Sequence, residues 1–512
     1  EDPNVSLYPS QIVIPYPKAG TPNPLVEVKV FNLQDNATSS MDIPFEVESN
    51  RWVYAITWVP GSISQYLGIS VKNRDQNEER LIISDAISGA TENNILTWKA
   101  ENGWALGQPP LWIDSDRFIT IGNNSNHLHI ELFNRTSGFE KFLTSGDWEV
   151  RQVHKYVQSS NEVYYSSTQV SSVENHVYSV NVDTLEVKRT SVSSIQESEP
   201  AYYSANFSPK DDYFILTYTG LKVPLQVVKS FSDDTEFILS NNAELSKTLS
   251  GYDMPKEEIT TIHVNGNDLN VKFIYPPGFD DGKAEFYPVL LSPYGGPNSQ
   301  QVKYGLSYGY DQYVSTHLNI VVAVIDNVGT AAKGIQFMQD TYLQLGVKEA
   351  LDQIEAAKIL GQRKEIKADR IAIRGSSFGG LLTLSCLVVP EGSSTFRAGV
   401  SVAPVTDWRF YDTAYTERFM LTPQQNPEGY NASSILNKVS NIKTNLLVIH
   451  GTADDNVHFQ NSAELNVQMV RAGVQYDVMY YANRDHAITG DGAREHYYTY
   501  MTSYLKNKLV DS

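Results

Sequence analysis

The first half of the chain, up to about residue 250, consists of short apolar runs separated by polar turn clusters. Residues 26–31 alternate polar and apolar side chains, and residues 52–58, 117–121 and 213–218 are rich in aromatic and β-branched side chains. This composition and a period of two are typical of β-strands. Strands so short and evenly spaced predict a sandwich or a propeller, and recurrence over roughly forty to fifty residues favours propeller blades.

From about residue 254 the pattern changes to compact apolar strands that alternate with helical stretches. We expect strands at residues 287–291, 320–325, 371–373 and 446–449. Residues 348–358 have a helical pattern. A later helix, ended by Gly473, should carry four apolar side chains on one face, Phe459, Ala463, Val467 and Val470. Alternating strands and helices predict a doubly wound, mainly parallel sheet with its active site at the carboxyl ends of the strands.

The length of 512 residues is too great for a single hydrophobic core. We therefore expect two domains, a β-propeller over residues 1–250 and an α/β domain over residues 251–512. The net charge of −19, without a cluster of Lys and Arg, repels phosphate backbones and excludes nucleic acid as an expected partner.

Other features of the chain bear on its compartment. The longest apolar runs, residues 318–325 and 381–389, are shorter than the roughly eighteen residues of a membrane span. The single cysteine, Cys386, lies in an apolar helical stretch and is expected to be buried. Asn-x-Ser/Thr motifs (sequons) for N-linked glycosylation, as found in secreted glycoproteins, begin at Asn4, Asn36, Asn123, Asn134, Asn206 and Asn431.

The most informative motif is Gly375-x-Ser377-x-Gly379, which directly follows a β-branched apolar strand and precedes a long apolar helical stretch. A serine can be exposed at a sharp strand-to-helix turn only if its neighbours two positions away are small. Ser377 is therefore the candidate nucleophile of a serine hydrolase.

A serine nucleophile needs a base and a carboxylate, which follow it along the chain in this type of fold. Asp454 lies in the loop after the strand at residues 446–449 and is the candidate acid, with Asp455 as an alternative that could instead cap the next helix. His486 follows a strand at residues 476–481 and is the candidate base. We expect structural roles for the remaining nearby histidines, His450, His458 and His496.

The oxyanion of an acyl-transfer reaction also needs hydrogen-bond donors. The backbone amide of Phe378, next to the nucleophile, is the first candidate donor. A Gly-rich turn after the strand at residues 287–291 could direct the Tyr294 hydroxyl to the same place.

Several longer runs resemble the dipeptidyl peptidase IV family and its fungal dipeptidyl aminopeptidase members. The runs are residues 13–24, 352–357, 402–408, 415–418 and 450–460. The resemblance covers essentially the whole chain. It implies a serine exopeptidase of the prolyl oligopeptidase type, in which a β-propeller caps an α/β-hydrolase domain, and it implies no metal or cofactor.

By matching motifs, the resemblance implies Ser377, Asp454 and His486 as the triad, with the Phe378 amide and the Tyr294 hydroxyl as the oxyanion hole. It implies a pocket for proline with five lining residues, Val405, Trp408, Tyr411, Tyr415 and Val457. It also implies that Asn456 binds a carbonyl of the substrate. From helical spacing alone, Tyr411 and Tyr415 would instead form a core stripe.

The chain departs from the family pattern at three places. Ser376 stands beside the nucleophile where the family has tryptophan, and residues 326–329 lack the arginine of the family's Asp-Gly-Arg-Gly turn. The glutamate pair that binds the substrate's amine lies, in the family, upstream of the segment matching Tyr8-Pro9. We therefore expect the chain to lack the first blades, this amine anchor and any membrane anchor. The chain has two other pairs of neighbouring glutamates, at residues 78–79 and 257–258, and we expect their side chains to be solvated.

The sequence thus predicts an enzyme that removes N-terminal dipeptides with Pro or Ala second. Two alternatives are a non-catalytic family member that acts through propeller contacts and a serine esterase with the same triad. The resemblance also implies a homodimer in the secretory route, either extracellular or anchored to a vacuolar or cell-surface membrane through a segment outside this chain.

Overall fold

The computed structural model describes residues 13–45, 50–61, 65–92, 96–191, 200–231 and 235–511. The sequon at Asn4 and the segment around Tyr8 lie outside the described residues. No helix in the described ranges combines the length and apolar character that crossing a bilayer requires.

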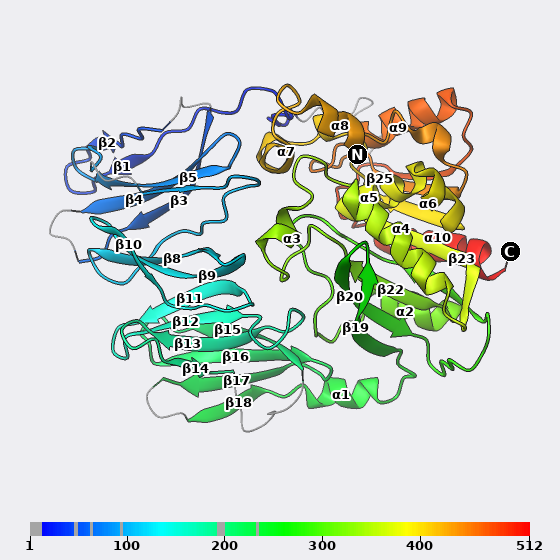
Figure 1. Ribbon diagram of the computed structural model, residues 1–512, viewed down its shortest axis with the longest axis horizontal. Coiled ribbons are helices and arrows are strands. Elements are labelled where there is room, and N and C mark those ends of the chain that lie inside the picture. Colours follow the sequence, from blue (N-terminus) through cyan, green and yellow to red (C-terminus); the bar gives the residue numbers. More distant parts are fainter. Residues whose placement is uncertain are drawn as a thin grey trace.

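Strands β3 to β18 form four antiparallel sheets, each made of four strands consecutive in sequence (Figure 1). The first contains β3 (Arg51–Trp58), β4 (Tyr66–Asn73), β5 (Glu78–Asp85) and β6 (Leu96–Lys99). The second contains β7 (Leu111–Trp112), β8 (Arg117–Asn124), β9 (His127–Asn134) and β10 (Gly138–Phe142). The third contains β11 (Val150–Val157), β12 (Glu162–Ser167), β13 (His176–Asn181) and β14 (Val187–Arg189). The fourth contains β15 (Ala201–Phe207), β16 (Tyr213–Gly220), β17 (Leu225–Ser230) and β18 (Glu236–Ser240).

These sheets are propeller blades, as the sequence predicted, and neighbouring blades share apolar cores. Ile121 and Leu132 of the second sheet lie in one buried cluster with Val163 and Tyr165 of the third. Aromatic and β-branched side chains fill the space between the faces because they pack well on pleated surfaces. The predicted strands therefore form one continuous stack of sheets.

The predicted strand at residues 26–31 is shorter in the structure. Only β1 (Lys29–Phe31) pairs, with β2 (Thr38–Ser40). One further bond, from the Met41 amide to the Val28 carbonyl at 2.9 Å, extends the pairing. The alternating pattern correctly predicted a strand, but the strand is short because β2 pairs with only three of its residues.

The second half contains one eight-stranded sheet of order β19-β20-β22-β21-β23-β24-β25-β26. Its strands are β19 (Lys256–Val264), β20 (Asn267–Tyr275), β21 (Tyr287–Leu291), β22 (Val321–Asp326), β23 (Ile366–Ser376), β24 (Ala398–Val402), β25 (Asn445–Gly451) and β26 (Asp477–Tyr481). The strands from β21 to β26 run parallel, and β19 and β20 are antiparallel. The sheet is doubly wound and mainly parallel, as predicted.

Helices connect the strands and cover the sheet. They are α1 (Ala243–Leu249), α2 (Tyr310–Leu318), α3 (Ile335–Gln339), α4 (Lys348–Gly361), α5 (Phe378–Val388), α6 (Pro390–Thr395), α7 (Thr413–Met420), α8 (Pro427–Ser433), α9 (Gln460–Arg471) and α10 (Ala493–Leu505). Short helical turns are η2 (Trp408–Phe410), η3 (Val439–Asn441) and η4 (Lys506–Val510).

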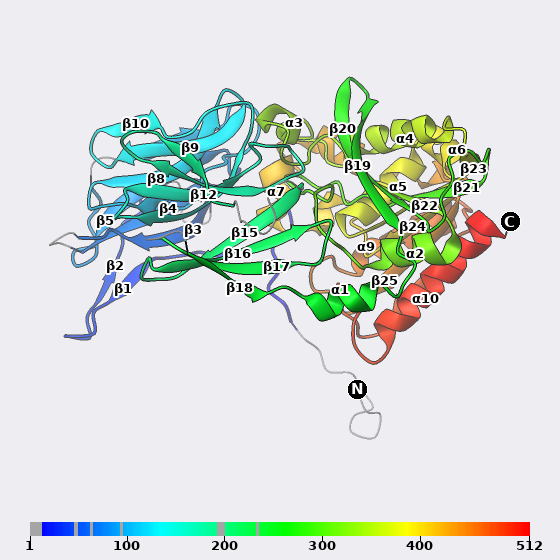
Figure 2. The ribbon, with the colours of Figure 1, turned by 90° about the horizontal axis from the view of Figure 1, so that it is seen from below.

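The two faces of the sheet are buried under different helices (Figure 2). Ile373 of β23 belongs to the cluster that includes residues of α4, α5 and α9, whereas its neighbour Ala372 belongs to the cluster of α2 and α10. Successive side chains of a strand point to opposite faces, so a strand covered on both sides must be apolar throughout. Cys386 is buried in α5, as expected.

Helix α9 was predicted correctly, but its buried face was not. Val467 and Val470 are 40% and 69% exposed. The buried residues are Asn461, Ser462, Leu465 and Met469. Leu465 and Met469 are four residues apart and reach the core, while the polar Asn461 binds the Thr406 amide at 2.9 Å. The apolar pattern failed because two polar residues of this face are buried for their hydrogen bonds.

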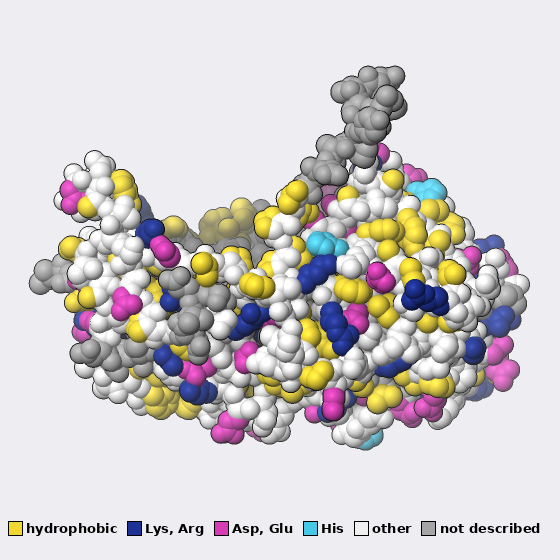
Figure 3. Space-filling model, turned by 90° about the horizontal axis from the view of Figure 1, so that it is seen from above, with side chains coloured by type: hydrophobic (Ala, Val, Ile, Leu, Met, Phe, Trp, Pro, Cys, Tyr) yellow, Lys and Arg dark blue, Asp and Glu magenta, His cyan; other side chains and the backbone are white. Residues whose placement is uncertain are grey.

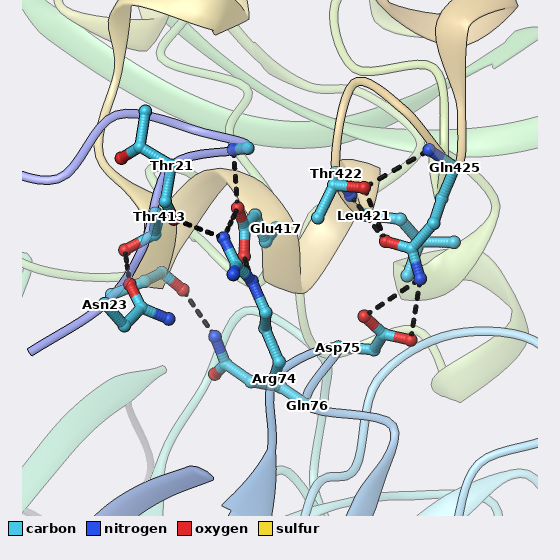
Figure 4. Close-up of polar contacts among 12 residues, drawn as sticks. Thr21, Asn23, Arg74, Asp75, Gln76, Thr413, Glu417, Leu421, Thr422 and Gln425 are labelled. Atoms are coloured by element: carbon cyan, nitrogen blue, oxygen red, sulfur yellow. Dashed lines mark hydrogen bonds and ion pairs between the residues drawn. The ribbon is translucent and has the colours of Figure 1, made fainter. Parts of the chain in front are cut away.

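The propeller and the α/β domain lie side by side, and polar side chains join them around α7 (Figures 1 and 4). The loop between β4 and β5 supplies Arg74, which binds Glu417 of α7 at 2.7 Å, and Gln76, which binds the Ala414 carbonyl at 2.6 Å. On the face in Figure 3, Lys and Arg side chains are interspersed with Asp and Glu.

Candidate active site

Ser377 occupies the turn between β23 and α5. Its backbone has φ 61° and ψ −119°, a region that non-glycine residues rarely adopt. Its amide donates to the Val402 carbonyl at 2.9 Å, and its carbonyl accepts from the Leu381 amide at 3.0 Å. These bonds hold the strained turn, which places the serine at the carboxyl end of the sheet.

The glycines around Ser377 are required by close backbone contacts. A Cβ on Gly375 would lie 2.2 Å from the Gly379 carbonyl oxygen, and a Cβ on Gly379 would lie 2.5 Å from the Pro293 carbonyl oxygen. Backbone atoms cannot move aside as a flexible side chain can. The motif thus has the geometry of a nucleophile elbow.

Asp454 and His486 are brought together by the loops after β25 and β26. His486 Nδ1 lies 2.7 Å from Asp454 Oδ2. Asp454 Oδ1 accepts the amides of Asn456 at 3.0 Å and Val457 at 2.9 Å. Asp455, the alternative acid, is exposed and forms no hydrogen bond with His486 among the described residues. The geometry is therefore that of an acid that orients an imidazole.

A second histidine, His450, shares the Asp454 carboxylate. His450 is buried, and its Nε2 lies 3.1 Å from Asp454 Oδ2 and 2.8 Å from the Val457 carbonyl, while its Nδ1 lies 2.7 Å from Ser462 Oγ. Two acceptors around Nε2 require a proton there. Burial alone would raise the pKa of Asp454, but the hydrogen bonds from His450 and His486 outweigh burial and lower it to about 2.

The Ser377 side chain neighbours the Tyr294 hydroxyl and interacts with it. In the described part of the chain no hydrogen bond joins Ser377 to His486. The His486 ring uses Nδ1 to bind Asp454, and its Nε2 has no hydrogen-bond partner among the described residues. Burial raises the pKa of the Tyr294 hydroxyl, so that it remains a protonated donor at neutral pH. Serine–base contacts in hydrolases often shorten only when substrate is bound.

The predicted oxyanion donors, the Phe378 amide and the Tyr294 hydroxyl, are both neighbours of Ser377. Phe378 is the first residue of α5, where backbone amides have no intrahelical acceptor. The Tyr294 ring centroid lies 6.0 Å from that of Phe378. The turn that carries Tyr294 is held by Asn327, whose Nδ2 donates to the Gly295 carbonyl at 3.1 Å. Sequence reasoning missed this role of Asn327, which stands in the turn that departs from the family.

Three of the predicted pocket residues, Trp408, Tyr411 and Tyr415, form an aromatic wall, which neighbours Ser377 through the Phe378 ring, 5.9 Å from that of Trp408. Trp408 and Tyr415 stack with centroids 5.8 Å apart, and the Tyr411 ring meets Tyr415 edge-on at 5.5 Å. Val405 and Val457 are buried, 2% and 0% exposed. Tyr411 and Tyr415 are only partly buried. Both tyrosines pack against the core cluster that contains Trp408, Val405 and Val457, so the pair contributes to the core and also exposes part of each ring.

Asn456 lies at the edge of this wall. It is exposed, and its Oδ1 accepts from the Tyr411 hydroxyl at 2.6 Å. Its main-chain carbonyl accepts from the hydroxyl of Tyr16, a residue of the N-terminal segment, at 2.8 Å. Sequence reasoning did not single out Tyr16, although prolines on both sides marked an extended segment.

The expectation that both glutamate pairs are solvated was wrong for Glu79. Glu79 is 3% exposed, hydrogen-bonds with the Tyr54 hydroxyl, and lies 3.6 Å from Lys72 Nζ. Burial raises the pKa of the Glu79 carboxyl. The strand alternation places Glu79 on the inner face of β5, where the aromatic and lysine side chains compensate for its desolvation. Its neighbour Glu78 and Glu257 are half-buried, and Glu258 is exposed.

The sequence profiles of two families match the chain. The profile of the prolyl oligopeptidase family matches residues 306–512, and that of the dipeptidyl peptidase IV N-terminal region matches residues 1–225. Together they include the predicted triad and most of the propeller.

Individual relatives and solved structures agree with the profiles. A probable dipeptidyl peptidase 4 of Emericella nidulans is 34% identical over 97% of this chain and 66% of its own length. Dipeptidyl aminopeptidase B of Saccharomyces cerevisiae is 34% identical over 94% of this chain and 62% of its own length. The chain thus spans less than two thirds of either fungal relative.

The crystal structure of Porphyromonas gingivalis dipeptidyl peptidase 4 superposes with a TM-score of 0.89 at 32% identity, over 98% of this chain and 70% of that one. With both profiles, the blade sheets and the elbow in agreement, the chain belongs to the dipeptidyl peptidase IV family of prolyl oligopeptidase-type serine peptidases.

Proposed function

We propose that this chain carries the catalytic site of a serine exopeptidase that releases N-terminal Xaa-Pro or Xaa-Ala dipeptides. The observation that carries the proposal is the strained turn of Ser377, which neighbours the Tyr294 hydroxyl and is followed by Phe378, whose ring lies 5.9 Å from that of Trp408 in the aromatic wall. A nucleophile beside a hydroxyl donor and an aromatic cluster is the combination that such a peptidase would need.

In the proposed reaction, Ser377 Oγ attacks the carbonyl carbon after the second substrate residue while His486 Nε2 takes its proton. The Phe378 amide and the Tyr294 hydroxyl hydrogen-bond to the oxygen that becomes negative. The C–N bond then breaks, and the departing amine takes the proton from His486. Water repeats the sequence on the acyl-enzyme, giving its proton to His486, and the free dipeptide leaves. Asp454 remains ionised and stabilises the imidazolium throughout.

The lining of the pocket supports the specificity for proline or alanine. The rings of Trp408, Tyr411 and Tyr415 are in mutual contact, Tyr411 and Tyr415 are partly exposed, and Val405 and Val457 are buried. A pyrrolidine ring or a methyl group fits such walls without leaving polar atoms unpaired, whereas a long or charged side chain would be desolvated there.

Hydrolysis of Gly-Pro-nitroanilide tests the proposal. Ser377→Ala should abolish turnover and labelling by a fluorophosphonate probe. Ser376→Ala, which changes the exposed neighbouring hydroxyl, should retain both. Turnover by Ser377→Ala at the parent rate would refute the assignment. Absence of labelling in the parent chain would favour a binding protein, and cleavage of acyl esters without dipeptide amides would favour an esterase.

We also propose a homodimer in the secretory route, as the family resemblance implies. Four sequon asparagines, Asn36, Asn123, Asn206 and Asn431, are exposed, so glycans could be attached without disturbing the core. A single-chain mass by light scattering would contradict the dimer. An unchanged mobility after glycosidase treatment of protein from the native source would contradict glycosylation.

A further inference from the structure

The N-terminal segment lies directly against the edge of the candidate pocket. Lys18 and Asp412 form an antiparallel bridge. The Ala19 amide donates to the Tyr411 carbonyl at 3.0 Å, and the Thr413 amide donates to the Pro17 carbonyl at 3.0 Å. These backbone bonds connect the segment that precedes the propeller blades with the residues that begin α7.

Tyr16 is the side chain of this segment that contacts two of the predicted substrate-binding residues, Asn456 and Tyr411. Its hydroxyl donates to the Asn456 carbonyl at 2.8 Å. Its ring centroid lies 4.1 Å from that of His458 and 6.5 Å from that of Tyr411. Burial, with Asp412 and Tyr411 nearby, raises the pKa of the Tyr16 hydroxyl, so it stays a donor at any physiological pH.

Asn456 is held at three points, and this arrangement determines which of its groups is available. The carboxylate of Asp454 accepts the Asn456 amide at 3.0 Å, Tyr16 binds its carbonyl, and the Tyr411 hydroxyl donates to its side-chain oxygen at 2.6 Å. With Oδ1 occupied by a donor, the side-chain NH₂ group is directed elsewhere. That group has no hydrogen-bond partner in the described ranges, so it can donate to a carbonyl of a bound peptide.

We propose that Tyr16 is a positioning residue of the peptide-binding site, which holds Asn456 and Tyr411 in the arrangement that binds the substrate's backbone carbonyl. The proposal rests on the proposed exopeptidase function. It makes affinity for the peptide dependent on a residue that lies 361 positions before Ser377, by the difference of their numbers. Because Tyr16 does not contact the reacting atoms, it should affect substrate binding more than the chemical step.

The kinetic test compares Tyr16→Phe with Tyr213→Phe, a control at a half-exposed tyrosine of β16. One lost hydrogen bond to a site group typically weakens binding roughly threefold to tenfold. We expect Tyr16→Phe to raise KM for Gly-Pro-nitroanilide by about this factor, with kcat within twofold of the control. An unchanged KM, or a loss confined to kcat, would overturn the proposal.

A second measurement is independent of activity. Hydrogen–deuterium exchange should be faster in Tyr16→Phe than in Tyr213→Phe for peptides that span residues 455–459, because the Asn456 loop loses one restraint. Equal exchange in the two variants would overturn the positioning role. If the parent chain labels with fluorophosphonate but does not cleave dipeptide amides, the proposed function fails, and the exchange experiment still decides the role of Tyr16.

Discussion

Arg74 and Glu417 form a two-point ion pair across the boundary between the propeller and the α/β domain. Arg74 Nε lies 2.7 Å from Glu417 Oε2, and one terminal nitrogen lies 2.8 Å from Oε1 (Figure 4). The Glu417 side chain is 0% exposed, and it also accepts the Gly20 amide at 2.7 Å. Glu417 is on α7, two residues after Tyr415, so this pair connects the propeller with the wall of the candidate pocket.

Removing only one partner of this pair should be costly. In Arg74→Met the Glu417 carboxylate stays buried without its cation. We expect the free energy of unfolding to fall by roughly 3 kcal/mol. This is the lower end of the range for broken buried pairs, because Arg74 is partly exposed. Thermal unfolding would report the loss. The double variant Arg74→Met/Glu417→Gln should recover part of it. Lys348→Met, which breaks an exposed pair with Asp340, serves as the control and should change the melting temperature little.

Substitution of the elbow glycine should disrupt the nucleophile. The added methyl group of Gly379→Ala would meet the Pro293 carbonyl at 2.5 Å, so the backbone must shift. We expect a stability loss of about 1–3 kcal/mol and at least a hundredfold slower fluorophosphonate labelling, because the position of Ser377 depends on this contact. Gly305→Ala has open space around it and should behave like the parent protein. Parent-like labelling by Gly379→Ala would contradict the elbow.

The two neighbouring aspartates should differ sharply. Asp454→Asn keeps the shape of the residue but removes the charge that orients His486, and we expect kcat to fall by roughly 10³–10⁴. Asp455→Asn, at an exposed position, should retain activity within a few-fold. Hydrolysis of Gly-Pro-nitroanilide measures both, and equal losses would reopen the choice of acid.

The lowered pKa of Asp454 also has a consequence for stability. A carboxylate whose pKa falls from 3.8 in the unfolded chain to about 2 in the folded protein stabilises the fold above the higher value. This contribution should disappear as the pH falls from about 4 to about 2. Unfolding midpoints of the parent protein and Asp454→Asn should therefore converge across this range, and parallel curves would contradict the assignment.

Glu349 predicts an opposite pH dependence. It is 0% exposed in α4, neither carboxyl oxygen has a hydrogen-bond partner among the described residues, and burial raises the pKa of its carboxyl from 4.5 to about 8, although nearby backbone amides oppose the rise. The protein should then lose stability as the pH rises from about 4.5 through 8, because ionisation is easier in the unfolded chain.

Glu349→Gln removes this ionisation while keeping the shape of the side chain. Between pH 5 and pH 9 we expect its melting temperature to fall less than that of the parent. The corresponding difference in the free energy of unfolding should be roughly a few kcal/mol. Glu355→Gln changes an exposed carboxylate of the same helix and should follow the parent. An identical pH profile for Glu349→Gln would show that Glu349 is not the responsible group.

Local patterns were enough to locate the strands of both domains, the elbow at Ser377 and the order of its proposed partners. They were enough because the spacing of apolar residues, the length of each apolar run and the positions of small residues all depend on the surroundings of residues close together in the sequence. His450, for which the sequence predicted a structural role, is buried against the Asp454 carboxylate. The pattern failed where polar residues are buried, as in α9 and at Glu79, because burial there depends on partners from other elements.

The sequence by itself therefore determined the two kinds of domain and the candidate chemistry of Ser377, Asp454 and His486. Only the tertiary structure decided that Tyr16 reaches Asn456 and that Arg74 reaches Glu417, across sequence separations of 440 and 343 residues. Contacts between residues so far apart in the sequence depend on how the two domains pack. The free energy of that packing depends on the complementarity of two surfaces, and the spacing of apolar residues within one segment does not predict it.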